Sequence, residues 1–279
     1  MKKILLLVIA TVLFVSPFVA ATTMTASDKT QSQRTMPSTT SEFTHTVFIE
    51  EGVTTWCPDC PNAEEALFSI YNSSDYPFYY VPLVYDQTKL GADRMYGHYH
   101  GFAFPTIFID GGFSQKVGGA STPQLVEQLY RPLIEEAGAR VVHPLVVTTN
   151  VTGHGNAKLD ITVTVKNIGT KPYIGILRSY VTEIVSRWMT QHGHPFHFGL
   201  LGYAIKKIIF VSPQKTRTYT ATFDGNAKQG NLTFPDIVDS NIMVISTVCH
   251  WQPHVVAQEQ YVLQHLAFYL DQATGARVN

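Results

Sequence analysis

The chain has 279 residues, of which 45% are hydrophobic and 15% are charged. This length predicts two globular domains, and the composition excludes a collagen-like or broadly disordered chain. A formal net charge of -1, without any basic cluster, argues against nucleic acid as a partner. Three cysteines are too few for a disulfide-rich scaffold, and an odd number leaves one of them unpaired.

The N-terminus has the pattern of an export signal. Two lysines precede an apolar stretch from Ile4 to about Val19, and small side chains end it, so residues 1–21 are predicted to be a signal peptide cleaved after Ala21. An uncleaved membrane anchor is the alternative, because the apolar stretch approaches the length of a membrane span. In both cases we expect an exported protein, periplasmic, extracellular or at the cell surface, where disulfides persist.

A polar linker and then an α/β domain are predicted after the signal. Residues 22–44 are rich in Thr, Ser and Gln, which is typical of a flexible linker, and residues 45–140 then alternate between strand and helix patterns. This order, β-α-β-α-β-β-α, predicts an α/β domain with a mixed sheet. Strands are expected at 46–50, 78–85, 105–112 and 113–119, and helices at 61–71, 88–100 and 122–138.

After Gly138 the pattern consists of strands without long helices. Seven strand-like runs are separated by turn residues, and "LDITVTV" alternates strictly, as one buried sheet face requires. Such a series predicts an immunoglobulin-like two-sheet sandwich over 143–265, followed by a C-terminal tail at 266–279. The runs are 143–153, 158–169, 173–185, 202–212, 216–225, 241–251 and 255–264.

Two cysteines lie in the run "WCPDC", after the first expected strand and before the helix that begins near Pro61. There Cys57 would face unpaired backbone N–H groups and the positive end of the helix dipole, which stabilise a thiolate. Cys60, one helical turn further on, is within reach for a disulfide. An exposed first thiol and a resolving second thiol are what thiol–disulfide exchange requires. A permanent structural disulfide and half of a metal site are the alternatives.

The expected element order, the motif "WCPDC" and the tripeptide "FPT" at 104–106 together resemble thioredoxin. The resemblance covers about residues 44–140. It implies that Pro105 follows a cis peptide bond and holds the substrate backbone beside Cys57. It also implies that the residues bordering a bound substrate are Trp56, Pro58 and Phe104.

The same resemblance gives Glu51 a role. The family has a buried carboxylate six residues before the first cysteine, and Glu51 stands at that position, where it would accept the proton of Cys60. The central dipeptide, Pro58-Asp59, departs from the family's Gly-Pro. Asp59 opposes ionisation of Cys57, whereas Pro58 stiffens the loop. The sequence therefore leaves open whether the protein is a reductase, an oxidase or an isomerase.

The whole chain is also similar to the exported Omp28-related group, whose members join a thioredoxin-like domain to a β-sandwich. The run "FIEEGVTTWCPDCPNAEEAL" matches that group's opening, and "LRSYVTEIV" and "MVISTVCHWQPHVVAQ" are similar to its later strands. This resemblance implies an architecture more than an activity.

These observations predict an exported thiol–disulfide oxidoreductase that acts on protein disulfides. Cys57 and Cys60 form its redox disulfide, and Glu51 and Pro105 complete the catalytic set. No cofactor beyond the dithiol is expected, and an unidentified redox partner would recycle it. Formation of a homodimer stays open, as does membrane anchoring if the signal is retained.

Two other functions compete with this prediction. In a cell-surface binding module, the sandwich would do the work and the CxxC would be a structural disulfide. A metal-handling protein would use the dithiol and the histidines of the run 192–198, although no carboxylate or cysteine stands at ligand spacing with them, so no metal ligand is assigned. Cys249 is expected to be a buried, inert thiol, with an intermolecular disulfide as the alternative. The histidines are His192, His194 and His197.

Overall fold

The computed structural model describes residues 42–101, 103–258 and 261–279, which belong to one compact unit that begins at Thr40. The predicted signal peptide, 1–21, and most of the predicted linker lie outside the described residues. None of the helices in the described part of the chain is long and apolar enough to cross a membrane.

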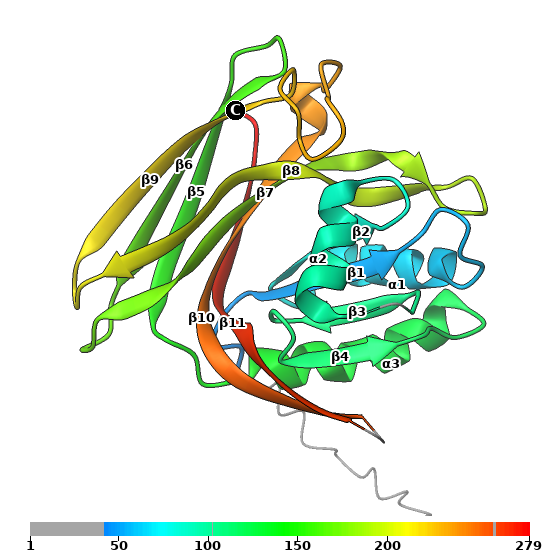
Figure 1. The fold of residues 1–279 in the computed structure, drawn as a ribbon, viewed down its shortest axis with the longest axis horizontal. Helices are drawn as coiled ribbons and strands as arrows, with labels where there is room; N and C mark the ends of the chain where they lie inside the picture. Colours follow the sequence, from blue (N-terminus) through cyan, green and yellow to red (C-terminus); the bar gives the residue numbers. More distant parts are fainter. Residues whose placement is uncertain (1–41, 102, 259–260) are drawn as a thin grey trace, which may run out of the picture. The chain divides into compact units, whose positions relative to one another are not determined.

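The first half of this unit is a four-stranded sheet with three helices (Figure 1). The strand order is β2-β1-β3-β4, with β1 parallel to β2 and antiparallel to β3. All seven elements expected between residues 46 and 138 are present in the expected order. Their bounds are β1 Val47–Val53, α1 Cys60–Ser73, β2 Phe78–Val84, α2 Lys89–Tyr99, β3 Thr106–Ile109, β4 Ser114–Val117 and α3 Pro123–Gly138.

Local signals explain where the helices begin. The Thr122 side chain accepts a hydrogen bond from the backbone N–H of Leu125, and Pro123 occupies the first turn of α3, where a missing N–H costs nothing. Pro61 occupies the first turn of α1 in the same way, so this helix begins at Cys60. The start of α1 is therefore encoded locally, and it positions the second cysteine of the motif.

Two further sheets follow α3. One has the strand order β11-β10-β7-β8 and the other β5-β6-β9, and all neighbours in both are antiparallel. Six of the seven expected runs fall on β5 to β10, but the seventh, 255–264, spans the end of β10 and the start of β11, which also occupies most of the expected tail. The bounds are β5 Leu145–Gly153, β6 Lys158–Asn167, β7 Tyr173–Met189, β8 Pro195–Val211, β9 Thr216–Asp224, β10 Ile242–Gln258 and β11 Tyr261–Arg277.

The predicted fold class, an α/β thioredoxin-like domain followed by a separate immunoglobulin-like sandwich, is wrong. The described residues are mostly β and form three sheets. One core cluster joins Phe48 and Leu67 from the first half to Tyr180, Phe198 and Ile245 from the second. A core that draws large side chains from both halves does not divide into two independent domains.

Strand length is the physical reason for this difference. Strands β7, β8, β10 and β11 have 17 residues each, about three times the usual length of a strand. Figure 1 shows β10 and β11 running between β5 on one side and β1 on the other, and both contact β5. A polar link crosses the same boundary, because Glu50 in β1 accepts hydrogen bonds from Arg94 in α2 and from Tyr180 in β7.

Candidate functional site

Cys57 and Cys60 form a disulfide at the start of α1, with their Cα atoms 5.4 Å apart. The backbone N–H of Cys60, the first residue of the helix, donates to Cys57 Sγ at 3.2 Å. The first N–H groups of a helix have no partner inside it and lie at the positive end of its dipole. The fold thus directs a donor at the Cys57 sulfur, which favours a thiolate there once the disulfide is reduced.

The disulfide is less exposed than the sequence suggested. We expected an exposed first thiol, but Cys57 is 2% exposed and Cys60 is 0% exposed. Both belong to a core cluster that extends into the strands of the second half, and Phe104 packs against that cluster. Pro58, between the cysteines, is exposed. The two cysteines are buried because strands distant in sequence pack against them, and no local sequence pattern predicts that packing.

The residues expected to border a substrate lie together at the disulfide. Trp56 is 61% exposed and meets the ring of Phe104 edge to face, with ring centroids 6.1 Å apart. The peptide bond between Phe104 and Pro105 is cis, as the resemblance implies. A Cβ placed on Gly119 would lie 3.7 Å from Pro105 Cγ and 3.8 Å from the carbonyl oxygen of Asp59. The Pro105 loop and the CxxC loop therefore meet beside Gly119.

Glu51, the expected proton acceptor, is fully buried in β1, and its carboxyl oxygens have no hydrogen-bond partner among the described residues other than the neighbouring carboxyl of Glu64. Burial raises the pKa of this carboxyl well above 4.5, and the neighbouring carboxyl of Glu64 raises it further. The hydroxyl of Tyr130, from α3, is also buried without a described partner, and burial followed by the charge of Glu51 raises its pKa. Burial and the neighbouring carboxyl of Glu64 thus both favour the protonated form of Glu51.

Glu64, which the sequence analysis missed, is the neighbour of Glu51. It stands in α1 four residues after Cys60, on the same helix face, and it is buried. Its Oε1 accepts from the hydroxyl of Tyr80 at 3.1 Å, while its Oε2 has no described partner. A second buried carboxyl beside Glu51 disfavours the ionised form of Glu51. An acidic residue on the apolar face of a helix is the signal that could have identified Glu64.

His197 connects this carboxyl pair to a surface groove. Its backbone N–H and its Nδ1 lie 2.7 and 3.0 Å from Glu64 Oε1, and its ring stacks on Phe68 with centroids 3.4 Å apart. The His197 side chain is 19% exposed and lines a groove of about 490 Å³ with His192 and His194. The imidazole therefore touches a buried carboxylate on one side and the groove on the other.

The remaining sequence candidates have other surroundings. Within the described ranges, His192, His194 and His197 do not bring three ligand atoms to metal-binding distance. Cys249, in β10, is a free and buried thiol, and burial raises its pKa to about 12. The expectation of a buried Cys249 is confirmed.

No family model and no curated protein matches this chain. Among solved structures, its fold is similar to HBP35 of Porphyromonas gingivalis, with a TM-score of 0.59, 13% sequence identity, and coverage of 85% of this chain and 76% of that one. Weaker matches include protein AGR_C_4864 from Agrobacterium tumefaciens, with a TM-score of 0.44, 13% identity and coverage of 84% and 95%.

A domain of the outer membrane lipoprotein Omp28 from Porphyromonas gingivalis also matches, with a TM-score of 0.27, 13% identity and coverage of 50% of this chain and 91% of that one. No family model confirms the resemblance to thioredoxin. The likeness to HBP35 shows a shared fold.

Proposed function

We propose that this exported protein catalyses thiol–disulfide exchange through Cys57 and Cys60. The observation that carries the proposal is the buried carboxyl of Glu51 in β1 beside that of Glu64, which lies on the face of α1 that bears Cys60. A permanent disulfide needs no proton donor. Exchange, in contrast, moves a proton each time Cys60 becomes a thiol or loses one.

The cost of the carboxyl pair supports this proposal. Burying a polar group without a hydrogen-bond partner costs about 1–3 kcal/mol, and an apolar side chain at the same place would cost nothing. Three buried oxygens, both of Glu51 and Oε2 of Glu64, have no hydrogen-bond partner outside this carboxyl pair among the described residues. Strongly perturbed carboxyls cluster at functional sites, where such a cost is offset by chemistry.

The chemistry proceeds in two exchange steps. The Cys57 thiolate attacks a substrate disulfide, so a mixed disulfide forms and one substrate sulfur leaves as a thiolate. Glu51 passes its own proton to Glu64 and can then accept the proton of Cys60. Cys60 attacks Cys57 Sγ, which forms the enzyme disulfide and releases the second substrate sulfur as a thiolate. Two electrons pass from the dithiol to the substrate. An external thiol reductant reverses both steps at the enzyme, and Glu51 then returns the proton to Cys60.

His197 gives the proton a route to solvent. Its Nδ1 contacts Glu64 Oε1, and its side chain reaches the groove. A neutral imidazole carries one proton and accepts a second on its other nitrogen, so it passes a proton through without moving. Glu51, Glu64 and His197 then form a relay from Cys60 to water.

The equilibrium reduction potential of the Cys57–Cys60 pair tests this function. We expect a value between about -270 and about -120 mV, the range of exchange enzymes. A value below about -300 mV would mark a structural disulfide and overturn the proposal. Cys57→Ser is the control, because a serine cannot form the mixed disulfide, and this variant should lose all exchange with a fluorescent disulfide substrate.

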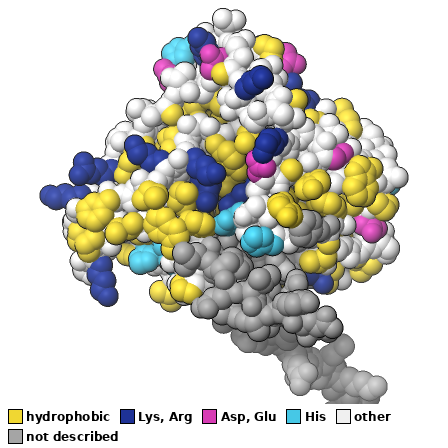
Figure 2. Space-filling model, in the orientation of Figure 1, with side chains coloured by type: hydrophobic (Ala, Val, Ile, Leu, Met, Phe, Trp, Pro, Cys, Tyr) yellow, Lys and Arg dark blue, Asp and Glu magenta, His cyan; other side chains and the backbone are white. Residues whose placement is uncertain are grey.

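A cell-surface binding module is the second candidate, and one surface favours it. Ile174 in β7 pairs with Phe210 in β8, and both side chains are exposed, as is Ile208. Lys206 and Lys207 come directly before Ile208 in β8. Figure 2 shows hydrophobic and basic side chains together at the left of the view. β8 is also the edge of its sheet, which suits pairing with another chain. A potential in the structural range would favour this candidate.

A further inference from the structure

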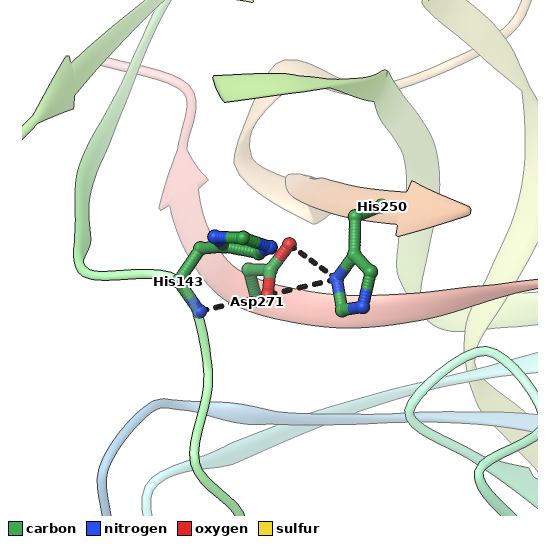
Figure 3. A group of neighbouring side chains, drawn as sticks. All are labelled: His143, His250 and Asp271. Atoms are coloured by element: carbon green, nitrogen blue, oxygen red, sulfur yellow. Dashed lines mark hydrogen bonds and ion pairs between the residues drawn. The ribbon is translucent and has the colours of Figure 1, made fainter. Parts of the chain in front are cut away.

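A second polar cluster shares no residue with the disulfide site. His143 lies just before β5, His250 in β10 and Asp271 in β11. Figure 3 shows the Asp271 carboxylate between the two imidazole rings. The fold thus brings three potential metal ligands together, although His143 and Asp271 are more than a hundred residues apart in the sequence. The sequence did not predict this set; it indicated the histidines of the run 192–198 as the ones that a metal-handling protein would use.

A β-bulge places Asp271 in this cluster. Val248 pairs with Gln272 and Cys249 pairs with Leu270, so Asp271 is the extra residue of the bulge and has no cross-strand partner. Bulges redirect a side chain that regular pairing would point elsewhere. The Asp271 side chain is fully buried. A buried carboxylate is costly unless cations or donors surround it, and Tyr173, His143 and His250 surround this one.

The spacing of the three side chains fits one metal ion. His250 Nδ1 lies 3.0 and 2.9 Å from the two oxygens of Asp271. Two ligands on one zinc ion, each about 2.0–2.2 Å from the metal, are about 3.3 Å apart, so this pair is already near the required spacing. The ligand atoms of all three residues lie within 4.8 Å of one another. The widest spacing therefore has to close by about 1.5 Å, which the exposed side chain of His143 allows.

The groups around the carboxylate hold it in place. The Tyr173 hydroxyl donates to Asp271 Oδ2 at 2.8 Å, and the backbone N–H of His143 donates to Asp271 Oδ1 at 3.0 Å. Outer partners of this kind orient the ligands of metal sites and raise their affinity. Because His143 is exposed and His250 is partly exposed, solvent can fill the remaining coordination position.

We propose that His143, His250 and Asp271 bind one divalent first-row transition metal ion, with zinc as the expected class. Two imidazoles and one carboxylate are ligands that suit zinc, and three protein ligands with an open position are typical of sites that bind water or a further ligand. The proposal does not rest on exchange at the disulfide.

Titration with cobalt(II) tests this site in the untagged chain with its disulfide oxidised. Cobalt(II) replaces zinc in such sites and absorbs visible light when it is bound by few ligands. We expect saturation at one ion per chain and displacement by zinc. His143→Ala and His250→Ala should each lower the affinity at least about tenfold. Circular dichroism checks that both variants fold, and Asp271 is left unchanged because its loss alone could disturb the bulge.

Two controls make each outcome decisive. His154 and Asp160 form an exposed pair at 2.7 Å, and no third ligand joins them among the described residues, so His154→Ala should leave the affinity unchanged. The double variant His192→Ala, His194→Ala should also bind normally. Equal affinity of the wild type and the His143→Ala variant would overturn the proposal, as would loss of binding in either control.

Discussion

Two neighbouring residues of β1, Glu50 and Glu51, have the same side chain and comparable burial, but their pKa values are shifted in opposite directions. Glu50 accepts from Arg94 Nε at 2.8 Å and from the Tyr180 hydroxyl at 3.0 Å. Burial alone would raise the pKa of Glu50, but the charge and hydrogen bonds of Arg94 outweigh it and hold the pKa below 4.5. Glu51 meets another carboxyl instead, and burial and Glu64 raise its pKa well above 4.5.

The difference follows from the alternation of side chains along a strand. Consecutive residues point to opposite faces of a sheet, so Glu50 faces α2 and β7 while Glu51 faces α1. On the first face the carboxylate is paired and joins the two halves of the unit. On the second it stays unpaired beside the helix that carries the disulfide. We therefore propose that Glu50 serves stability and Glu51 serves the proposed exchange.

The largest effect should come from breaking the Glu50 side. Arg94→Ala leaves the Glu50 carboxylate buried without its cation, so the free energy of unfolding should fall by about 3–5 kcal/mol. Urea unfolding measures this loss. Lys89→Ala is the matched control, because Lys89 and Asp93 pair on the same helix but are exposed, and it should cost less than about 1 kcal/mol. Equal losses in both variants would argue against the role of Glu50.

Breaking the Glu51 side should affect rate instead of stability. Glu51→Gln keeps the shape but removes the proton carrier, so exchange should slow about 100-fold, while the free energy of unfolding at about pH 4 changes by less than about 1 kcal/mol. Stopped-flow measurement of the reaction with a disulfide substrate gives the rate. Glu50→Gln should do the reverse, with a large loss of stability and a near-normal rate in the folded fraction. If Glu51→Gln exchanges at the wild-type rate, Glu51 carries no proton.

The two carboxyls should also give stability opposite dependences on pH. Because the pKa of Glu50 is lowered, its stabilisation is present above about pH 4.5 and is lost as the pH falls through the folded value. The pKa of Glu51 is raised, so its cost is absent below about pH 4.5 and grows as the pH rises towards the folded value.

Urea midpoints at about pH 4 and about pH 8 separate these contributions. Glu51→Gln should gain stability relative to the wild type as the pH rises, whereas the deficit of Glu50→Gln should shrink as the pH falls. A Glu51→Gln difference that is constant across this range would show that Glu51 has an ordinary pKa.

The smallest effect concerns the outer end of the relay. His197→Phe keeps the stack on Phe68 and removes both ring nitrogens, so exchange should slow by no more than about tenfold, because water in the groove can still reach Glu64. Stopped-flow measurement of exchange at one pH checks this. His194→Phe, in the same groove, is the control and should leave the rate unchanged.

Sequence patterns predicted what local chemistry determines. The start of α1, the disulfide of Cys57 and Cys60, the cis bond before Pro105 and the burial of Glu51 all depend on nearby residues or on a recognised motif. Glu64 carried a weaker local signal, as an acid on an apolar helix face.

The other features depend on tertiary packing and could not be predicted in this way. His197 reaches Glu64 across 133 residues, and the 17-residue strands that merge the two halves have the same alternation as short ones. The bulge at Asp271 arises from the register of two strands, which neither strand encodes alone.

The infrared difference spectrum between the oxidised and reduced protein tests the central claim most directly. A protonated carboxyl has a carbonyl stretch separate from that of a carboxylate. We predict this band at about pH 7, where an ordinary glutamate is ionised, with a shift when Cys57 and Cys60 are reduced and its loss in Glu51→Gln. If the wild type has no such band, or if the band ignores the state of the disulfide, the carboxyl pair does not serve thiol–disulfide exchange.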